Sequence, residues 1–215
     1  MKKVAVMIYP HFSMQEISSL TDALTVWFDI EIDVFASSKE IIKTEDNFQV
    51  AANKTFDEFT VEDYSCLILP GILYPLPALI DEKNIAFLES LKGEDILISS
   101  ISSSPILLAK AGLLDDVQFT LGLFEEIIQF HDFIPSQNVV RKPVVKDQNF
   151  ITAIGFAFRE FAMETIRTLG IDDLEYGLFN PVTREYTEEE LTFRTDEANF
   201  NDYVTQYNES QKNKK

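Results

Sequence analysis

The chain has 215 residues, of which 46% are hydrophobic and 25% are charged. This composition is typical of a globular protein and excludes a disordered tail protein, a collagen-like repeat and a coiled coil. Thirty-six acidic and 18 basic residues leave a formal net charge of −18. Because so acidic a surface repels phosphate groups and anionic lipids, we expect no nucleic acid and no membrane as a partner.

The thiol and imidazole groups are few. Cys66 is the single cysteine, so it cannot form an internal disulfide, and with His11 and His131 it cannot complete a Cys/His zinc site. We therefore expect no metal and no cofactor. The apolar run at residues 4–9 is too short for a signal peptide, and no run reaches the roughly 20 apolar residues that span a bilayer. The sequence predicts a cytoplasmic location.

Apolar segments of strand length alternate with stretches of helical spacing along the first 170 residues. The expected strands are 4–9, 31–36, 66–69, 95–99, 139–145 and 150–152, and a short hairpin is expected from 41–43 and 48–51. The expected helices are 13–28, 81–91, 104–111 and 156–169. Strands of this apolar kind alternating with helices predict a mainly parallel sheet that is covered on both faces.

Residues 171–215 differ in character from the preceding chain. They are polar and acidic, and the capping-box pattern at 187–190 predicts one short helix that starts at Thr187. We therefore divide the chain into an α/β domain, residues 1–170, and an acidic C-terminal extension, residues 171–215.

Three loops follow predicted strands at the edge where ligands of parallel sheets gather, namely 9–15, 70–77 and 100–104. The third loop carries the most chemistry, because an apolar strand leads through a run of serines into Pro105 and a helix. Such a turn can hold one side chain in a strained conformation near a helix N-terminus, whose free N–H groups stabilise an anion. The alternative interpretation is a serine-rich helix cap without further function.

Residues 96–120, ILISSISSSPILLAKAGLLDDVQFT, resemble the nucleophile elbow of the DJ-1/PfpI (ThiJ-like) family, within the class I glutamine amidotransferase-like superfamily. The resemblance extends over most of residues 3–169 and includes the segments KVAVMIYP, FSMQE, LILPG, VVKDQNFITAIG and FAFREFAMETIRTLG. It implies a doubly wound α/β sandwich with a mainly parallel, flavodoxin-like sheet, and a homodimer.

The resemblance also implies roles for individual positions. The family's nucleophilic cysteine corresponds to Ser102, the acid that contacts it corresponds to Glu16, and its histidine corresponds to Gly122. The expected oxyanion donors are the backbone N–H groups of Ile72 and Ser103.

The remaining pocket positions are Gly71, Ser104 and His11. Ser104 stands where the family usually has glycine, and Gly71 belongs to the turn LILPG. Glu16 also fits a capping box with Ser13. His11, on the first of the three loops, and His131 are the histidines that could replace the missing one, and an ordinary loop or surface position is the alternative for both.

The two replacements at positions 102 and 122 change the expected chemistry. A serine hydroxyl is far less acidic than a thiol and needs a positioned base, which glycine cannot supply. The first hypothesis is a non-catalytic or weakly active protein that binds a small molecule or a partner through the retained pocket. The second is a hydrolase, amidase or glyoxalase/deglycase-like enzyme that uses Ser102 as nucleophile with Glu16.

Overall fold

The computed structural model describes residues 2–171, residues 185, 187, 189 and 192, and residues 195–212. The chain separates into two units, Met1–Phe179 and Asn180–Lys215. The second unit contains helix α7 (Glu197–Lys212). The short helix predicted at 187–190 includes residues 188 and 190, which lie outside the described residues. The domain boundary after residue 170 stays a prediction.

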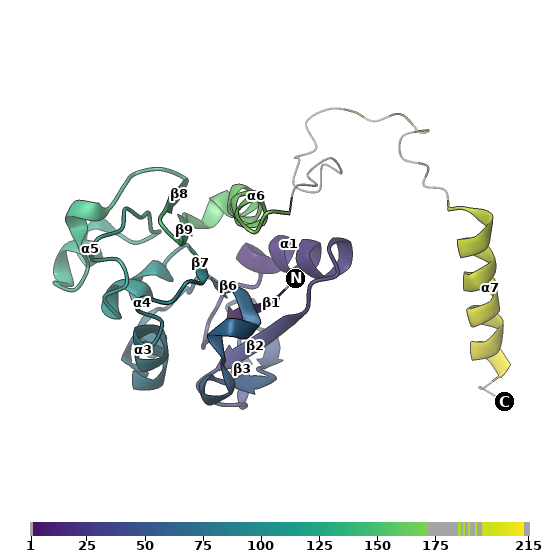
Figure 1. Ribbon diagram of the computed structural model, residues 1–215, viewed down its shortest axis with the longest axis horizontal. Coiled ribbons are helices and arrows are strands. Elements are labelled where there is room, and N and C mark those ends of the chain that lie inside the picture. The colour runs from purple at the N-terminus through teal and green to yellow at the C-terminus, as the bar shows by residue number, and fades with distance from the viewer. Residues whose placement is uncertain are drawn as a thin grey trace. The chain divides into compact units, whose positions relative to one another are not determined.

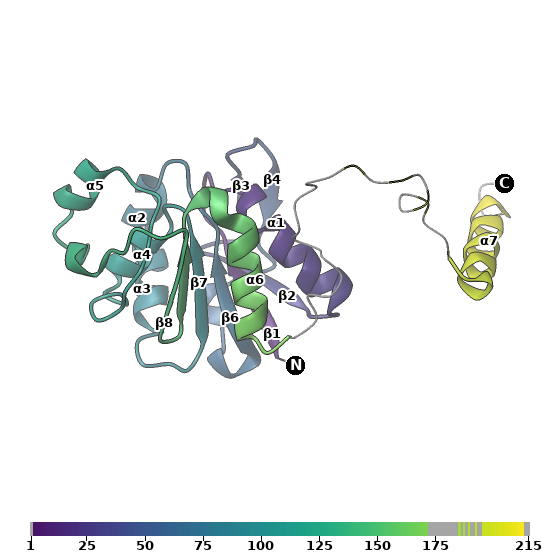
Figure 2. The same ribbon diagram turned by 90° about the horizontal axis from the view of Figure 1, so that it is seen from above.

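A seven-stranded sheet forms the centre of the first unit, with the order β5-β2-β1-β6-β7-β9-β8 (Figure 2). Its strands are β1 (Lys3–Met7), β2 (Ile32–Ala36), β5 (Lys54–Thr55), β6 (Tyr64–Leu69), β7 (Leu97–Ile101), β8 (Val144–Asp147) and β9 (Phe150–Ala153). All neighbouring strands pair in parallel except β8 and β9, which form an antiparallel hairpin. A separate antiparallel pair, β3 (Ile41–Lys43) and β4 (Gln49–Ala51), confirms the predicted short hairpin.

Helices cover both faces of this sheet, as Figures 1 and 2 show. Helix α1 (Gln15–Asp22) packs against α6 (Phe158–Thr168) on one face, while α3 (Glu82–Glu89) packs against α4 (Pro105–Lys110) on the other. The central strands are mainly apolar, as expected for strands with both faces buried, and the last four residues of β6 are inaccessible to solvent. The predicted doubly wound α/β sandwich is therefore confirmed.

The first predicted helix differs from expectation at both ends. Met14, not Ser13, precedes the first helical residue, and no side chain caps the helix, so the predicted capping box with Glu16 is wrong. The helix also does not run regularly to residue 28, since a π-helical turn occupies Ala23–Trp27. The capping pattern fails because the Glu16 carboxyl group lies beside Ser102 and not at the start of the helix.

The strand predicted at 139–145 begins later than expected. Val139 makes only an isolated bridge with Phe119, and β8 starts at Val144. Pro143 stands immediately before that strand and has no N–H to donate to a neighbour, so it limits pairing at this point.

Two short helices were not predicted, α2 (Leu76–Ile80) and α5 (Glu125–Phe130). The first overlaps the loop predicted at 70–77, where Pro75 and Pro77 disfavour a helix assignment. No element was predicted for the second, which begins with two adjacent acids. Phe124 and Phe130 flank α5 and are more than three-quarters exposed. These two rings are therefore not part of the core.

Candidate functional site

Ser102 occupies a sharp turn between β7 and α4. Its φ angle is +64°, in the left-handed region, where a residue with a side chain is strained by about 1–2 kcal/mol. The turn is held from two sides, because the Ser102 N–H donates to Ala153 O at 2.7 Å and the Gly122 N–H donates to Ser102 O at 2.7 Å. The strained strand-to-helix turn expected from the sequence is thus present.

The Glu16 side chain, from α1, lies beside Ser102, and two glycines make room for the pair. A Cβ atom placed on Gly71 would overlap Glu16 Oε2 and lie 2.6 Å from Ser102 Cβ. A Cβ atom placed on Gly155 would collide with Glu16 Oε1 and lie 3.1 Å from Ser102 Oγ. The structure therefore brings together three positions that the sequence analysis singled out, Ser102, Glu16 and Gly71. Gly155, which begins the turn before α6, was not predicted.

Burial raises the pKa of the Glu16 carboxyl group to about 7. The Ser102 hydroxyl lowers this pKa, the negative charge of Glu45 raises it, and the backbone N–H of Gly71 lowers it. In the described part of the chain, Glu16 Oε2 is buried without a hydrogen-bond partner. The carboxyl group can therefore give or take a proton near neutral pH at a point beside the Ser102 hydroxyl.

One of the two expected oxyanion donors is engaged within the protein. The Ile72 N–H donates to Ser103 Oγ at 3.1 Å, and the Ser103 hydroxyl donates to Ile72 O at 2.6 Å. No acceptor for the backbone N–H of Ser103 is found among the described residues. A ligand oxygen above the turn could therefore accept directly from the Ser103 N–H. To accept from the Ile72 N–H as well, it would have to displace the Ser103 hydroxyl.

Ser104 has a supporting position beneath the turn. It is fully buried, and its hydroxyl lies 2.7 Å from Ser100 Oγ, 3.0 Å from Leu69 O and 2.7 Å from Ile101 O. These contacts join the ends of β6 and β7 to the start of α4. The side chain thus fixes the turn and does not line the cavity above it.

The two histidines lie away from Ser102. The His11 ring contacts the Tyr74 ring edge-on, with centroids 5.8 Å apart. His131 lies between Phe130 and Phe133, with ring centroids 5.0 Å and 4.7 Å away. Neither imidazole belongs to the cavity that contains Ser102.

Ser102 and Glu16 form the polar floor of a cavity of about 590 Å³. Its wall is mainly apolar and comes from the loop after β6 and the segment that leads into α5. The lining residues are Glu16, Glu45, Ile72, Leu73, Pro75, Ser102, Ser103, Gly122, Leu123, Phe124 and Ile127. The sequence analysis missed Glu45 and the wall formed by 123–127. Only the three-dimensional fold brings these residues to the elbow, and their sequence carries no motif.

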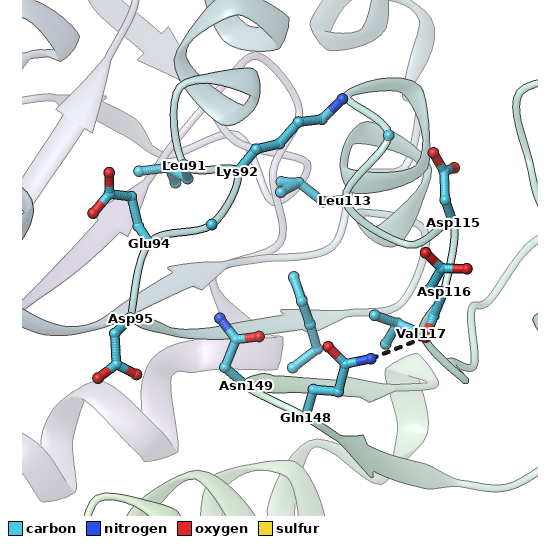
Figure 3. Close-up of a pocket in the computed structure, with 13 residues that line it drawn as sticks. Leu91, Lys92, Glu94, Asp95, Leu113, Asp115, Asp116, Val117, Gln148 and Asn149 are labelled. Atoms are coloured by element: carbon cyan, nitrogen blue, oxygen red, sulfur yellow. Dashed lines mark hydrogen bonds between the residues drawn. The ribbon is translucent and has the colours of Figure 1, made fainter.

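A second cavity, of about 540 Å³, lies at the opposite edge of the sheet, where β7 and β9 begin (Figure 3). Figure 3 shows Lys92 extending towards Asp115, and Gln148 donating its amide to the Asp116 carbonyl at 3.0 Å. Asp115 and Asp116 are exposed. In the described part of the chain no group of three or more His, Cys, Asp or Glu side chains is placed to hold a metal ion. Nor does any described helix have the length and apolar character needed to cross a membrane.

The comparisons with known proteins agree with this fold and turn. The DJ-1/PfpI family model matches residues 2–168, and the chain belongs to that family. An isonitrile hydratase from Pseudomonas putida is 23% identical over 174 residues, which cover 79% of this chain and 73% of that protein. A DJ-1 protein homologue from Arabidopsis thaliana is 28% identical over 107 residues, half of this chain and 26% of that protein.

Solved structures show the same architecture. A DJ-1 superfamily protein from Agrobacterium tumefaciens has a TM-score of 0.74 at 21% identity, over 83% of this chain and 96% of that one. A ThiJ/PfpI family protein from Bacillus anthracis also has a TM-score of 0.74, at 23% identity, over 88% of this chain and 93% of that one. These likenesses establish the fold that the sequence motifs implied.

Proposed function

We propose that this chain binds a small molecule in the cavity above Ser102 and is at most weakly active as an enzyme. The proposal rests on the arrangement of the turn at Ser102. The turn has a strained backbone and lies under a cavity with a mainly apolar wall, but the Ile72 N–H already donates to Ser103 Oγ. Position 122 holds a glycine whose N–H is bonded to the Ser102 carbonyl. Such a site offers shape and polar anchoring, which binding requires.

Binding can be tested with cyclohexanol as the probe, because its compact apolar body and single hydroxyl suit an apolar wall over a polar floor. We expect the backbone amide signals of Gly71, Ser103 and Gly122 to shift on titration, as measured by NMR. The Leu123→Trp variant fills the cavity and should abolish these shifts. Val26→Trp, at an exposed position on the π-helical turn, is the matched control. Shifts that persist in Leu123→Trp, or that never appear in the wild type, would refute the proposal.

A second candidate function is favoured by the carboxyl group of Glu16, whose pKa of about 7 suits proton transfer near neutral pH. In this alternative, Ser102 Oγ adds to a carbonyl carbon, the π electrons of the C=O bond move onto its oxygen, and Glu16 accepts the hydroxyl proton. A carboxylate is a weak base towards an alcohol, which is why we place binding first. Activity can be tested with a panel of small carbonyl, amide and ester compounds. Cyclohexyl isonitrile is included because of the similarity to an isonitrile hydratase.

Substitutions at position 102 separate the two functions. The binding function predicts that the wild type and Ser102→Ala are equally inactive on the panel, while Ser102→Cys gains thiol reactivity. Turnover by the wild type that is lost in Ser102→Ala would establish the enzyme instead. Cyclohexanol titration of Ser102→Ala checks that the cavity itself is retained.

We also propose that the chain forms a homodimer, as the family resemblance implied, and that it lies in the cytoplasm. Exposed apolar side chains support a protein contact near the mouth of the cavity. Leu73, Tyr74, Leu76 and Ile80 are each about 60–70% exposed on the segment after β6. Sedimentation velocity of the full chain tests this proposal, and a single monomeric species at micromolar concentration would contradict it.

A further inference from the structure

The cavity above Ser102 has an uneven distribution of charge. Both of its ionisable lining residues, Glu16 and Glu45, are acids, and no lysine, arginine or histidine is among the lining residues. The two carboxyl groups lie close enough for the charge of Glu45 to raise the pKa of Glu16. A ligand in this cavity therefore meets two acidic side chains and, among the described lining residues, no basic one.

Glu45 reaches the cavity because the β3–β4 hairpin is fixed to the loop after β1. The Glu45 N–H donates to Phe12 O at 3.1 Å, and the His11 N–H donates to Lys43 O at 2.9 Å. Within the hairpin, Thr44 is buried and its hydroxyl accepts the Phe48 N–H at 3.0 Å. These bonds hold the backbone of residue 45 at the edge of the cavity, so the Glu45 side chain starts from a defined position there.

Glu16 and Glu45 differ in their surroundings. Glu16 belongs to the floor, where the Ser102 hydroxyl and the Gly71 N–H moderate its charge. Glu45 is half-buried at the hairpin turn, and it is not among the described residues that form a salt bridge. An anionic ligand group would be repelled by both, while an ammonium or amidinium group would pair with Glu45.

We propose that Glu45 is the specificity-determining residue of this pocket and selects ligands that carry a positive charge on a compact apolar body, against carboxylates of the same shape. This inference rests on the proposed binding function. The apolar wall, which includes Leu73, Leu123 and Ile127, takes the body of the ligand. The charged end lies towards the hairpin, where Glu45 is held.

The test compares three probes that share one body: cyclohexylammonium, cyclohexanol and cyclohexanecarboxylate. Dissociation constants are measured by NMR titration of the full chain at pH 8, above the pKa of about 7 that burial gives the Glu16 carboxyl group. We expect the ammonium to bind about tenfold more tightly than the carboxylate, because Glu45 attracts the ammonium whereas Glu16 and Glu45 both repel the carboxylate. In Glu45→Gln this ratio should fall about three- to fivefold, with the cyclohexanol affinity unchanged.

Two further variants make the result specific to the charge at position 45. Glu45→Lys should remove the preference for the ammonium. Asp46→Asn, the neighbouring exposed acid on the same turn, should leave the ratio as in the wild type. Equal wild-type affinities for the ammonium and the carboxylate, or a preference that is undiminished in Glu45→Gln, would overturn the inference while leaving cyclohexanol binding intact. Failure of all three probes to bind the wild type would overturn both the inference and the proposed function.

Discussion

The Glu16 carboxyl group predicts how the stability of the protein depends on pH. Its pKa rises from 4.5 to about 7 on folding, so the folded state holds the proton more tightly than the unfolded chain does. The stabilisation from that proton is complete below pH 4.5 and is lost as the pH rises through about 7. The free energy of unfolding should therefore fall between these two pH values.

The size of this effect follows from the shift. A rise in pKa from 4.5 to about 7 corresponds to about 3 kcal/mol at 1.36 kcal/mol per pH unit. Glu16 is only partly buried, so solvent screening reduces this figure to about 1–2 kcal/mol. The Glu16→Gln variant keeps the shape of the protonated acid and cannot ionise. It should be more stable than the wild type by about 1–2 kcal/mol at pH 8 and within about 0.5 kcal/mol of it at pH 5.

Urea denaturation at pH 5 and pH 8 measures this difference directly, because comparison with Glu16→Gln cancels the other carboxyl groups. Glu62→Gln, which changes an exposed acid on a different loop, is the matched control and should follow the wild type at both pH values. If the wild type and Glu16→Gln lose stability in parallel between pH 5 and pH 8, the carboxyl group does not sit beside Ser102 as the structure places it.

Two other substitutions and one labelling reaction test the site and the core. Gly71→Ala should lower the free energy of unfolding by about 1–3 kcal/mol, since the added methyl group meets Glu16 Oε2 and Ser102 Cβ. Urea titration measures this change, and an unchanged stability would contradict the close approach of Glu16 and Ser102 to Gly71. Leu24→Ala should cost about 2–5 kcal/mol in the same assay because Leu24 is fully buried, whereas exposed Val26→Ala should change little. Burial raises the pKa of the Cys66 thiol to about 12, so Ellman's reagent should label it only after unfolding; rapid labelling of the native protein would show that the thiol is accessible.

The centre of the sheet was predictable from sequence because its strands are mainly apolar segments of strand length. The hairpin at 41–51 and β6 before Pro70 follow from patterns a few residues long. Residue boundaries were less accurate where one residue overrides the pattern, as Pro143 does before β8. Helix α5 was missed because its apolar and acidic residues do not give a distinct helical stripe over six positions.

The candidate site was predictable only in part. Ser102 and Glu16 could be placed by their resemblance to a known motif, and the structure brings them together beside Gly71. Glu45 could not be placed, since it reaches the cavity through hydrogen bonds between segments that share no pattern. The pairing of the Ile72 N–H with Ser103 Oγ was also beyond the sequence, because a serine in this turn can face either the cavity or the neighbouring loop.

The close packing of residue 122 makes the two departures from the family pattern unequal. Exchanging the hydroxyl at position 102 for sulfur changes one atom and leaves the main chain where it is. The Cβ atom of a side chain at position 122 would lie 3.3 Å from the carbonyl carbon of Ser102. The two residues are already joined by the hydrogen bond from the Gly122 N–H to Ser102 O. Restoring an imidazole there therefore asks the Ser102 main chain to give by a few tenths of an ångström, whereas a thiol at position 102 needs no such movement.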